Sequence, residues 1–63
     1  MKKNEMLLTV QLGGFRVENV KLFNGAFRVY VYNGNKLCEV LKAGSMAGNQ
    51  NNLKQAARIA GII

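Results

Sequence analysis

The sequence predicts an α+β fold, in which four antiparallel strands form a β-meander and a single C-terminal helix follows them. Two asparagine–glycine pairs, Asn24-Gly25 and Asn33-Gly34, are typical of tight hairpin turns. Between them, residues 27–32 alternate apolar and polar side chains with the period of a strand. Residues 49–63 instead carry apolar side chains at helical spacing. The predicted order is therefore ββββα.

The 63-residue length indicates one small domain, whose hydrophobic core is barely sufficient for stability. We expect residues 1–63 to form this domain, with residues 1–5 frayed. Cys38 is the only cysteine and there is no histidine, which rules out an intramolecular disulfide and disfavours a zinc site. No apolar run reaches the roughly 18 residues of a membrane span, and residues 6–8 are too short for a signal peptide. We therefore expect a cytoplasmic protein with no membrane partner, which gains burial by forming a homodimer.

The first strand is expected at residues 6–12, and Gly13-Gly14 ends it because glycine adopts positive-φ turn conformations without strain. Two registers are open at this turn. A two-residue turn would place the apolar side chains of the strand on the basic face of the sheet. A three-residue loop, with Phe15 in the loop, would place them on the core face, and burial favours this second register. The side chains concerned are Leu8, Val10 and Leu12.

The second and third strands are expected at residues 15–23 and 26–32, joined by a two-residue turn at Asn24-Gly25. This register makes two apolar pairs on one face, Val20 with Val29 and Leu22 with Phe27. On the other face it pairs Asn19 with Tyr30 and Lys21 with Arg28. Cations directly opposite one another destabilise a sheet unless an anion lies between them. The register therefore fits a sheet that binds phosphate.

The fourth strand is expected at residues 36–42, after a turn of two or three residues, and the helix begins at Asn49 or Asn51, either of which is a suitable cap. Gly61 ends the helix. The apolar stripe of the helix is Leu53, Ala56, Ala57, Ala60 and Ile63. Its basic ridge is Asn51, Lys54 and Arg58. We expect the apolar end, Ile62-Ile63, to contact a partner copy in preference to the sheet.

The third strand separates two kinds of surface. Phe27, Val29 and Val31 share one face, which is an ordinary core, whereas the opposite face carries Arg28, Tyr30 and Tyr32. Aromatic side chains stack on unpaired bases, contributing about 1–3 kcal/mol per base without regard to sequence, and cations bind the phosphates. This face therefore predicts binding of single-stranded nucleic acid, provided that the helix covers the other face. The alternative interpretation is that the tyrosines serve β-propensity alone.

The charge balance supports an anionic partner. Nine lysines and arginines against three acids give a net charge of +6, which favours nucleic acid first and an anionic membrane surface second. Most of these cations lie inside predicted strands or the helix rather than in a tail. The alternative interpretation is that the charge provides only solubility.

Catalysis finds little support in the residues present. The only acids are Glu5, Glu18 and Glu39, and even a facing pair of Glu18 and Glu39 is more typical of solvated strand residues than of an acid–base pair. Cys38 has no histidine to activate it as a nucleophile. We therefore expect a protein that is not an enzyme, with no cofactor, no metal and no small-molecule substrate.

Residues 10–29, with Gly13-Gly14 and Asn24-Gly25 in hairpin positions, resemble the start of the transcriptional positive-coactivator family of single-stranded-DNA-binding domains. Residues 53–55 resemble the leucine–lysine pair of that family's helix, so the resemblance spans about residues 8–60. It implies four antiparallel strands and a helix, and a homodimer formed largely through the C-terminal helix. It also implies nucleic-acid contacts at Arg16, Lys21, Arg28 and Tyr30. Two features depart from the family, because residues 48–50 replace its proline-containing helix entry and the third hairpin is shorter.

Two other families share parts of this pattern. Residues 27–60 resemble the latter half of a double-stranded-RNA-binding domain, although the initial helix is missing, and the arm-binding domain of phage integrases has a similar shape. Duplex DNA or RNA binding is therefore one alternative function, and a small protein-interaction or inhibitor module is another. The size suits a phage-type accessory protein. The predicted nucleic-acid-binding residues are Arg16, Lys21, Arg28, Tyr30, Tyr32, Lys36, Lys54 and Arg58.

Overall fold

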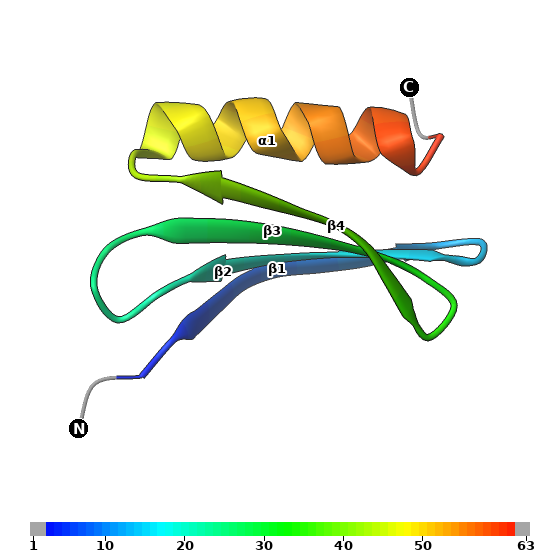
Figure 1. Ribbon diagram of the computed structural model, residues 1–63, viewed down its shortest axis with the longest axis horizontal. Coiled ribbons are helices and arrows are strands. Elements are labelled where there is room, and N and C mark those ends of the chain that lie inside the picture. The colour runs from blue at the N-terminus through cyan, green and yellow to red at the C-terminus, as the bar shows by residue number, and fades with distance from the viewer. Residues whose placement is uncertain (1–2, 62–63) are drawn as a thin grey trace.

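The computed structural model describes residues 3–61 and has the predicted order of elements (Figure 1). The strands are β1 (Glu5–Leu12), β2 (Phe15–Lys21), β3 (Phe27–Asn33) and β4 (Lys36–Ala43), and the helix is α1 (Met46–Ile59). All four strands form one antiparallel sheet in the order β1-β2-β3-β4, which confirms the ββββα prediction. The expected fraying of residues 1–2 and the predicted roles of Ile62 and Ile63 lie outside the described residues, whereas Glu5 already belongs to β1. Within residues 3–61, no helix is long and apolar enough to cross a membrane.

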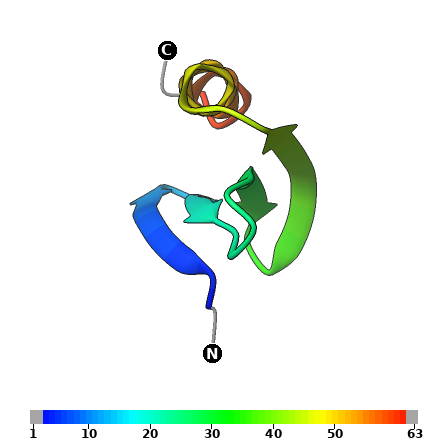
Figure 2. The ribbon, with the colours of Figure 1, turned by 90° about the vertical axis from the view of Figure 1, so that its left-hand side faces the viewer.

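The helix lies on one side of a strongly curved sheet (Figure 2) and contacts β3, β4 and, to a smaller extent, β2. The core between them consists of Val17, Val29, Val31 and Ala56, of which both β3 valines are fully buried. The face of the sheet that carries these valines is called the helix-side face, and the opposite one the open face. Because side chains alternate along β3, Arg28, Tyr30 and Tyr32 lie on the open face.

The second hairpin differs from its predicted register by one residue. Val20 pairs with Arg28 and Asn19 with Val29, so the predicted pairs of Val20 with Val29 and of Lys21 with Arg28 are wrong. β2 ends at Lys21, and residues 22–26 form a loop closed by hydrogen bonds from the Leu22 N–H to the Ala26 carbonyl (2.7 Å) and from the Gly25 N–H to the Leu22 carbonyl (2.9 Å). A shift of one residue reverses every side chain of a strand. It brings Val17 and Phe15 under the helix, where both pack in the core.

The first hairpin has the two-residue turn at Gly13-Gly14, with Leu12 paired to Phe15 and Gly13 at a positive φ of 56°. The predicted three-residue loop is therefore wrong, and Phe15 is the first residue of β2 rather than part of the loop. The apolar side chains of β1 nevertheless reach the helix-side face, because β2 is itself reversed relative to the prediction. The one-residue errors in the predicted registers of the first and second hairpins therefore cancel, and β1 has its apolar side chains on the predicted face. A bulge at Leu7 precedes this regular stretch.

The third hairpin has a two-residue turn at Gly34-Asn35, and an irregularity at Cys38 shifts the register of β4. Beyond it, Glu39 pairs with Val31 and so belongs to the helix-side face. Glu18 lies on the open face, because it pairs with Tyr30. The two glutamates therefore do not face one another.

The helix begins at Met46, earlier than predicted, because Ser45 is its cap. The Gly48 N–H donates a hydrogen bond to the Ser45 hydroxyl oxygen at 3.2 Å, which satisfies a first-turn donor. Asn49, expected as a cap, is instead buried in the helix. The C-terminal end follows the prediction, since Gly61 takes a φ of 77° just after the Ala60 cap.

Candidate nucleic-acid interface

The open face is a regular array of side chains in three rows that run across the four strands. Antiparallel pairing places directly opposed residues on the same face, so the rows follow from the register. The first row is Gln11, Arg16, Tyr32 and Leu37. The second row is Thr9, Glu18, Tyr30 and Val40. The third row is Met6, Val20, Arg28 and Lys42.

This array brings together half of the residues predicted to bind nucleic acid and separates the others. The predicted residues that share the open face are Arg16, Arg28, Tyr30 and Tyr32. Lys21 belongs to the helix-side face, because it pairs with Phe27. Lys36 lies beside the β3–β4 turn. Lys54 and Arg58 are exposed on α1, across the sheet from the open face, so they do not form one surface with the tyrosines.

Arg16 is the most constrained cation of the open face. Its guanidinium carbon lies 4.4 Å from the centre of the Tyr32 ring, in a cation–π contact. Its Nε atom lies 3.1 Å from Oε2 of Glu18, two residues along the same strand, without the geometry of a hydrogen bond. The two contacts hold the guanidinium over the ring of Tyr32. One face of that ring is thus covered, while the Arg16 side chain itself is 37% exposed.

Arg28 and Lys42 form the second basic feature of the open face. They are directly opposed on β3 and β4. Arg28 therefore does face another cation, but this cation is Lys42 of β4 and not, as predicted, Lys21 of β2. One Nη atom of Arg28 donates to the carbonyl of Phe27 at 2.8 Å, which anchors the guanidinium near the sheet, while Lys42 is exposed. Adjacent strand cations repel one another. An anion between them would relieve this repulsion.

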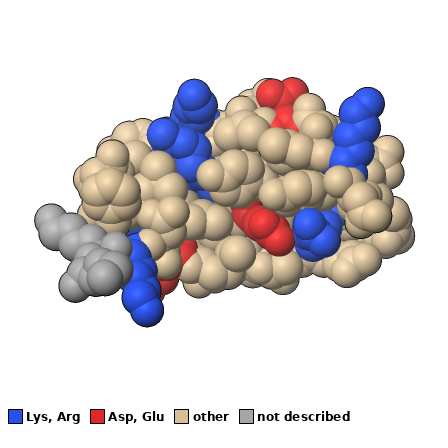
Figure 3. Space-filling model, turned by 60° about the horizontal axis from the view of Figure 1, so that its bottom comes forward, with Lys and Arg blue, Asp and Glu red and all other residues tan. Residues whose placement is uncertain are grey.

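The charges on this side of the molecule are not continuous. Figure 3 turns the side away from the helix forward and shows lysines and arginines at several separate places, with a carboxylate near the middle. From the register, Glu18 lies in the central row, between the row of Arg16 and the row of Arg28. The basic groups therefore lie in the two outer rows of the face, with Glu18 and Tyr30 between them, instead of forming an unbroken track.

Sequence reasoning missed Lys42 and the central position of Glu18. Which residues of adjacent strands lie side by side cannot be predicted until the register is known. In addition, the irregularity at Cys38 breaks the simple alternation of β4. Strict alternation along β4 would place Lys36 and Lys42 on the same face of the sheet, because they are six residues apart. The structure separates them.

Comparison with models of protein families, with curated proteins and with solved structures finds no match to this chain. The resemblance to the positive-coactivator family therefore stays a prediction, as do its implied contacts and helix-mediated dimer.

Proposed function

We propose that the open face binds single-stranded nucleic acid, preferentially DNA, with little selectivity for sequence. The observation that carries this proposal is the face of β3 that α1 leaves uncovered. On it Tyr30 lies in the central row, between the row of Arg16 and Tyr32 and the row of Arg28. The cytoplasmic location and the accessory role expected from the sequence belong to the same proposal.

The spacing of the aromatic groups suits an extended strand of nucleotides. Alternate residues of a β-strand lie about 6.8 Å apart, since the rise is about 3.4 Å per residue. The half-buried Tyr30 would offer the accessible part of its ring as a stacking surface. Next to it, the guanidinium of Arg16 lies over Tyr32 and would offer a second surface, since the Arg16 side chain is 37% exposed. Bases stack on aromatic rings and on arginine planes alike. Two successive bases therefore have two platforms on one line.

The phosphates of the same strand have a separate site at one end of the face. Arg28 and Lys42 provide two opposed cations there, and the charge of Lys42 is exposed to solvent. Contacts of this kind release counterions, so affinity falls as salt rises. A paired duplex would present phosphates to these cations but no base surface to the tyrosines. The proposal therefore implies that single strands bind more tightly than duplexes of the same sequence.

Replacing Tyr30 by alanine is expected to weaken binding of a labelled single-stranded oligonucleotide by roughly 5- to 150-fold, the equivalent of one lost stacking contact of about 1–3 kcal/mol. Fluorescence anisotropy over a salt series measures the effect, with a duplex of the same sequence in parallel. Tyr30→Phe keeps the ring and should retain most of the affinity. Phe23→Ala is the matched control, because Phe23 is an exposed aromatic residue in the loop between β2 and β3.

Three results would contradict the proposed function. One is that neither oligonucleotide binds at low salt, and another is that the duplex binds as tightly as the single strand. The third is that Tyr30→Ala has no larger effect than Phe23→Ala. The first of these would favour the alternative of a protein-interaction module.

Replacing Glu18 by glutamine is expected to strengthen single-strand binding by roughly twofold to fivefold. The substitution removes a negative charge from the middle of the open face and releases Arg16 from an ion pair, an interaction of about 0.2–1 kcal/mol at a partly exposed site. Glu39→Gln is the matched control, since it makes the same change of charge on the helix-side face. Equal effects of the two substitutions would show that only net charge matters and that Glu18 has no local role.

A further inference from the structure

β1 is an open edge of the sheet with apolar side chains on both faces. Seven of its eight residues are exposed, among them Met6 and Thr9 on the open face and Leu8 and Leu12 on the helix-side face. Leu8 is 43% and Leu12 46% exposed. The unpaired backbone groups of such an edge are a template for another strand, and proteins usually block it with lysine, proline or irregular geometry. The bulge of β1 lies at Leu7, which leaves residues 8–12 regular.

The two edges of the sheet differ in charge. β4, the other edge, carries Lys36, Glu39 and Lys42 and so has a net positive charge, whereas Glu5 is the only charged residue of β1. Two copies of a chain with a net charge of +6 repel one another over most of their surfaces. If two copies meet at β1, no lysine or arginine of one β1 strand faces the β1 strand of the other copy. The charge distribution therefore favours β1 over β4 as the contact between copies.

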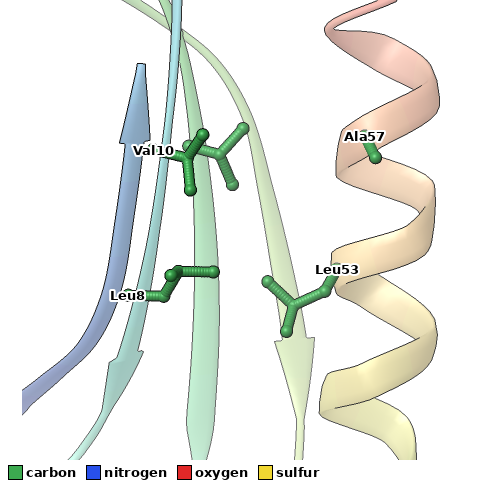
Figure 4. A pocket seen from close by; sticks show the side chains of 5 residues that line it. Leu8, Val10, Leu53 and Ala57 are labelled. Atoms are coloured by element: carbon green, nitrogen blue, oxygen red, sulfur yellow. The ribbon is translucent and has the colours of Figure 1, made fainter. Parts of the chain in front are cut away.

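An apolar hollow of about 170 Å³ lies beside this edge on the helix-side face (Figure 4). It arises because α1 covers β3 and β4 and does not reach β1. Leu8 and Val10 of β1 face Leu53 and Ala57 of α1 across it, and Val17 of β2 completes the lining. The apolar side of β1 is therefore left without a covering element within residues 3–61.

We propose that a second copy of this chain pairs with β1 through its own β1, antiparallel, so that the two sheets join into one of eight strands. Such an interface is self-complementary about a two-fold axis. In one such register, Val10 of one copy pairs with Val10 of the other, and the helix-side faces of the two sheets continue into one another. This register places Leu8 of one copy opposite Leu12 of the other. The leucines of both copies then lie together beside the two hollows. This inference goes beyond the proposed nucleic-acid function and does not depend on it.

The proposal differs from the dimer expected through the helix. The outward side of α1 carries Asn51, Lys54 and Arg58, all exposed, so pairing of two helices there would bring cations together. The contact at β1 consists of one strand edge and a few leucines. We therefore expect a weak dimer, with a dissociation constant in the micromolar range.

Sedimentation analysis of the whole chain, from micromolar to millimolar concentration at moderate salt, tests the pairing. The wild-type protein is expected to pass from 6.9 kDa to twice that mass with rising concentration. Leu8→Lys places a cation of each copy in the joined edge and should raise the dissociation constant by about tenfold or more, a loss of about 1.4 kcal/mol. Leu37→Lys is the matched control, because Leu37 is 45% exposed on the opposite edge strand and the added charge is the same. It should leave the dissociation constant unchanged.

Amide hydrogen exchange of the wild-type protein provides a second measurement that needs no variant to fold. Exchange of the amides of β1 should slow with rising concentration, whereas exchange of the amides of β4 should not. The proposal is overturned if the wild-type protein stays monomeric throughout or if β1 shows no dependence on concentration. It is also overturned if Leu8→Lys and Leu37→Lys weaken the dimer equally, or if Ile59→Lys on α1 dissociates it while Leu8→Lys does not.

Discussion

Replacing Ala56 by leucine is expected to lower the free energy of unfolding by about 2–3 kcal/mol. Ala56 has no exposed surface and lies against Val17, Val29 and Val31, so the larger side chain must push α1 away from the sheet. Overpacking of a tight core typically costs about 1–3 kcal/mol. For a chain of this length the total stability is only about 3–9 kcal/mol. Urea denaturation followed by circular dichroism measures the change.

The adjacent residue provides the control. Ala57 lines the apolar hollow between β1 and α1, so Ala57→Leu extends into free space instead of into the core. Filling such space should raise the free energy of unfolding by about 0.5–2 kcal/mol. The two variants make the same chemical change one residue apart on one helix. If both destabilise the protein to the same extent, the helix does not sit on the sheet with Ala56 at its contact.

Replacing Asn49 by alanine is the second change with a large expected effect. The side chains of Asn49 and Asn19 are both buried and exchange two hydrogen bonds, the Asn19 amide donating at 2.8 Å and the Asn49 amide at 2.9 Å. Asn19 also donates to the carbonyl of Arg28 at 3.0 Å. The substitution leaves the Asn19 oxygen buried without its partner. We expect a loss of about 1–3 kcal/mol in the free energy of unfolding, because unsatisfied buried polar groups are costly.

Asn52→Ala is the matched control for this prediction, since Asn52 is also a helix amide that bonds to the sheet. It donates to the carbonyl of Lys42 at 3.1 Å, but the bond is exposed and water replaces it. Asn52→Ala should therefore lower the free energy of unfolding by much less than Asn49→Ala does. A combined Asn19→Val and Asn49→Leu variant should recover much of the stability, because removing both partners leaves neither amide orphaned. Equal losses for Asn49→Ala and Asn52→Ala would contradict the buried pair.

The core face of β3 and the approximate positions of the turns were predictable because the signals are local. Strict alternation from Phe27 to Tyr32 assigns each side chain to a face without any knowledge of neighbouring strands. The glycines of the turns likewise mark the loops wherever the partners lie. The cation and the two tyrosines of β3 were therefore correctly grouped on one face.

The neighbours of β3 were not predictable in the same way. An asparagine–glycine pair suggested a two-residue turn, yet the second hairpin has a loop at residues 22–26, and the difference of one residue exchanged the faces of β2. Lys21 was consequently assigned to the binding face. In the structure, β2 instead places Arg16, Glu18 and Val20 on this face. The stretch of β2 has apolar residues at both parities, Val17 on one face and Val20 on the other, so alternation alone does not choose between the registers.

The sequence by itself determined the order of elements, the approximate positions of the turns and the two-sided character of β3, since each depends on residues close together in the chain. Only the tertiary structure decided the register of β2, the position of α1 and the composition of the open face. The physical reason is that these depend on contacts between distant residues. The amide pair of Asn19 and Asn49, thirty positions apart, joins β2 to the helix in one register, in which Val17 is buried beneath α1 and Arg16 and Glu18 are on the open face.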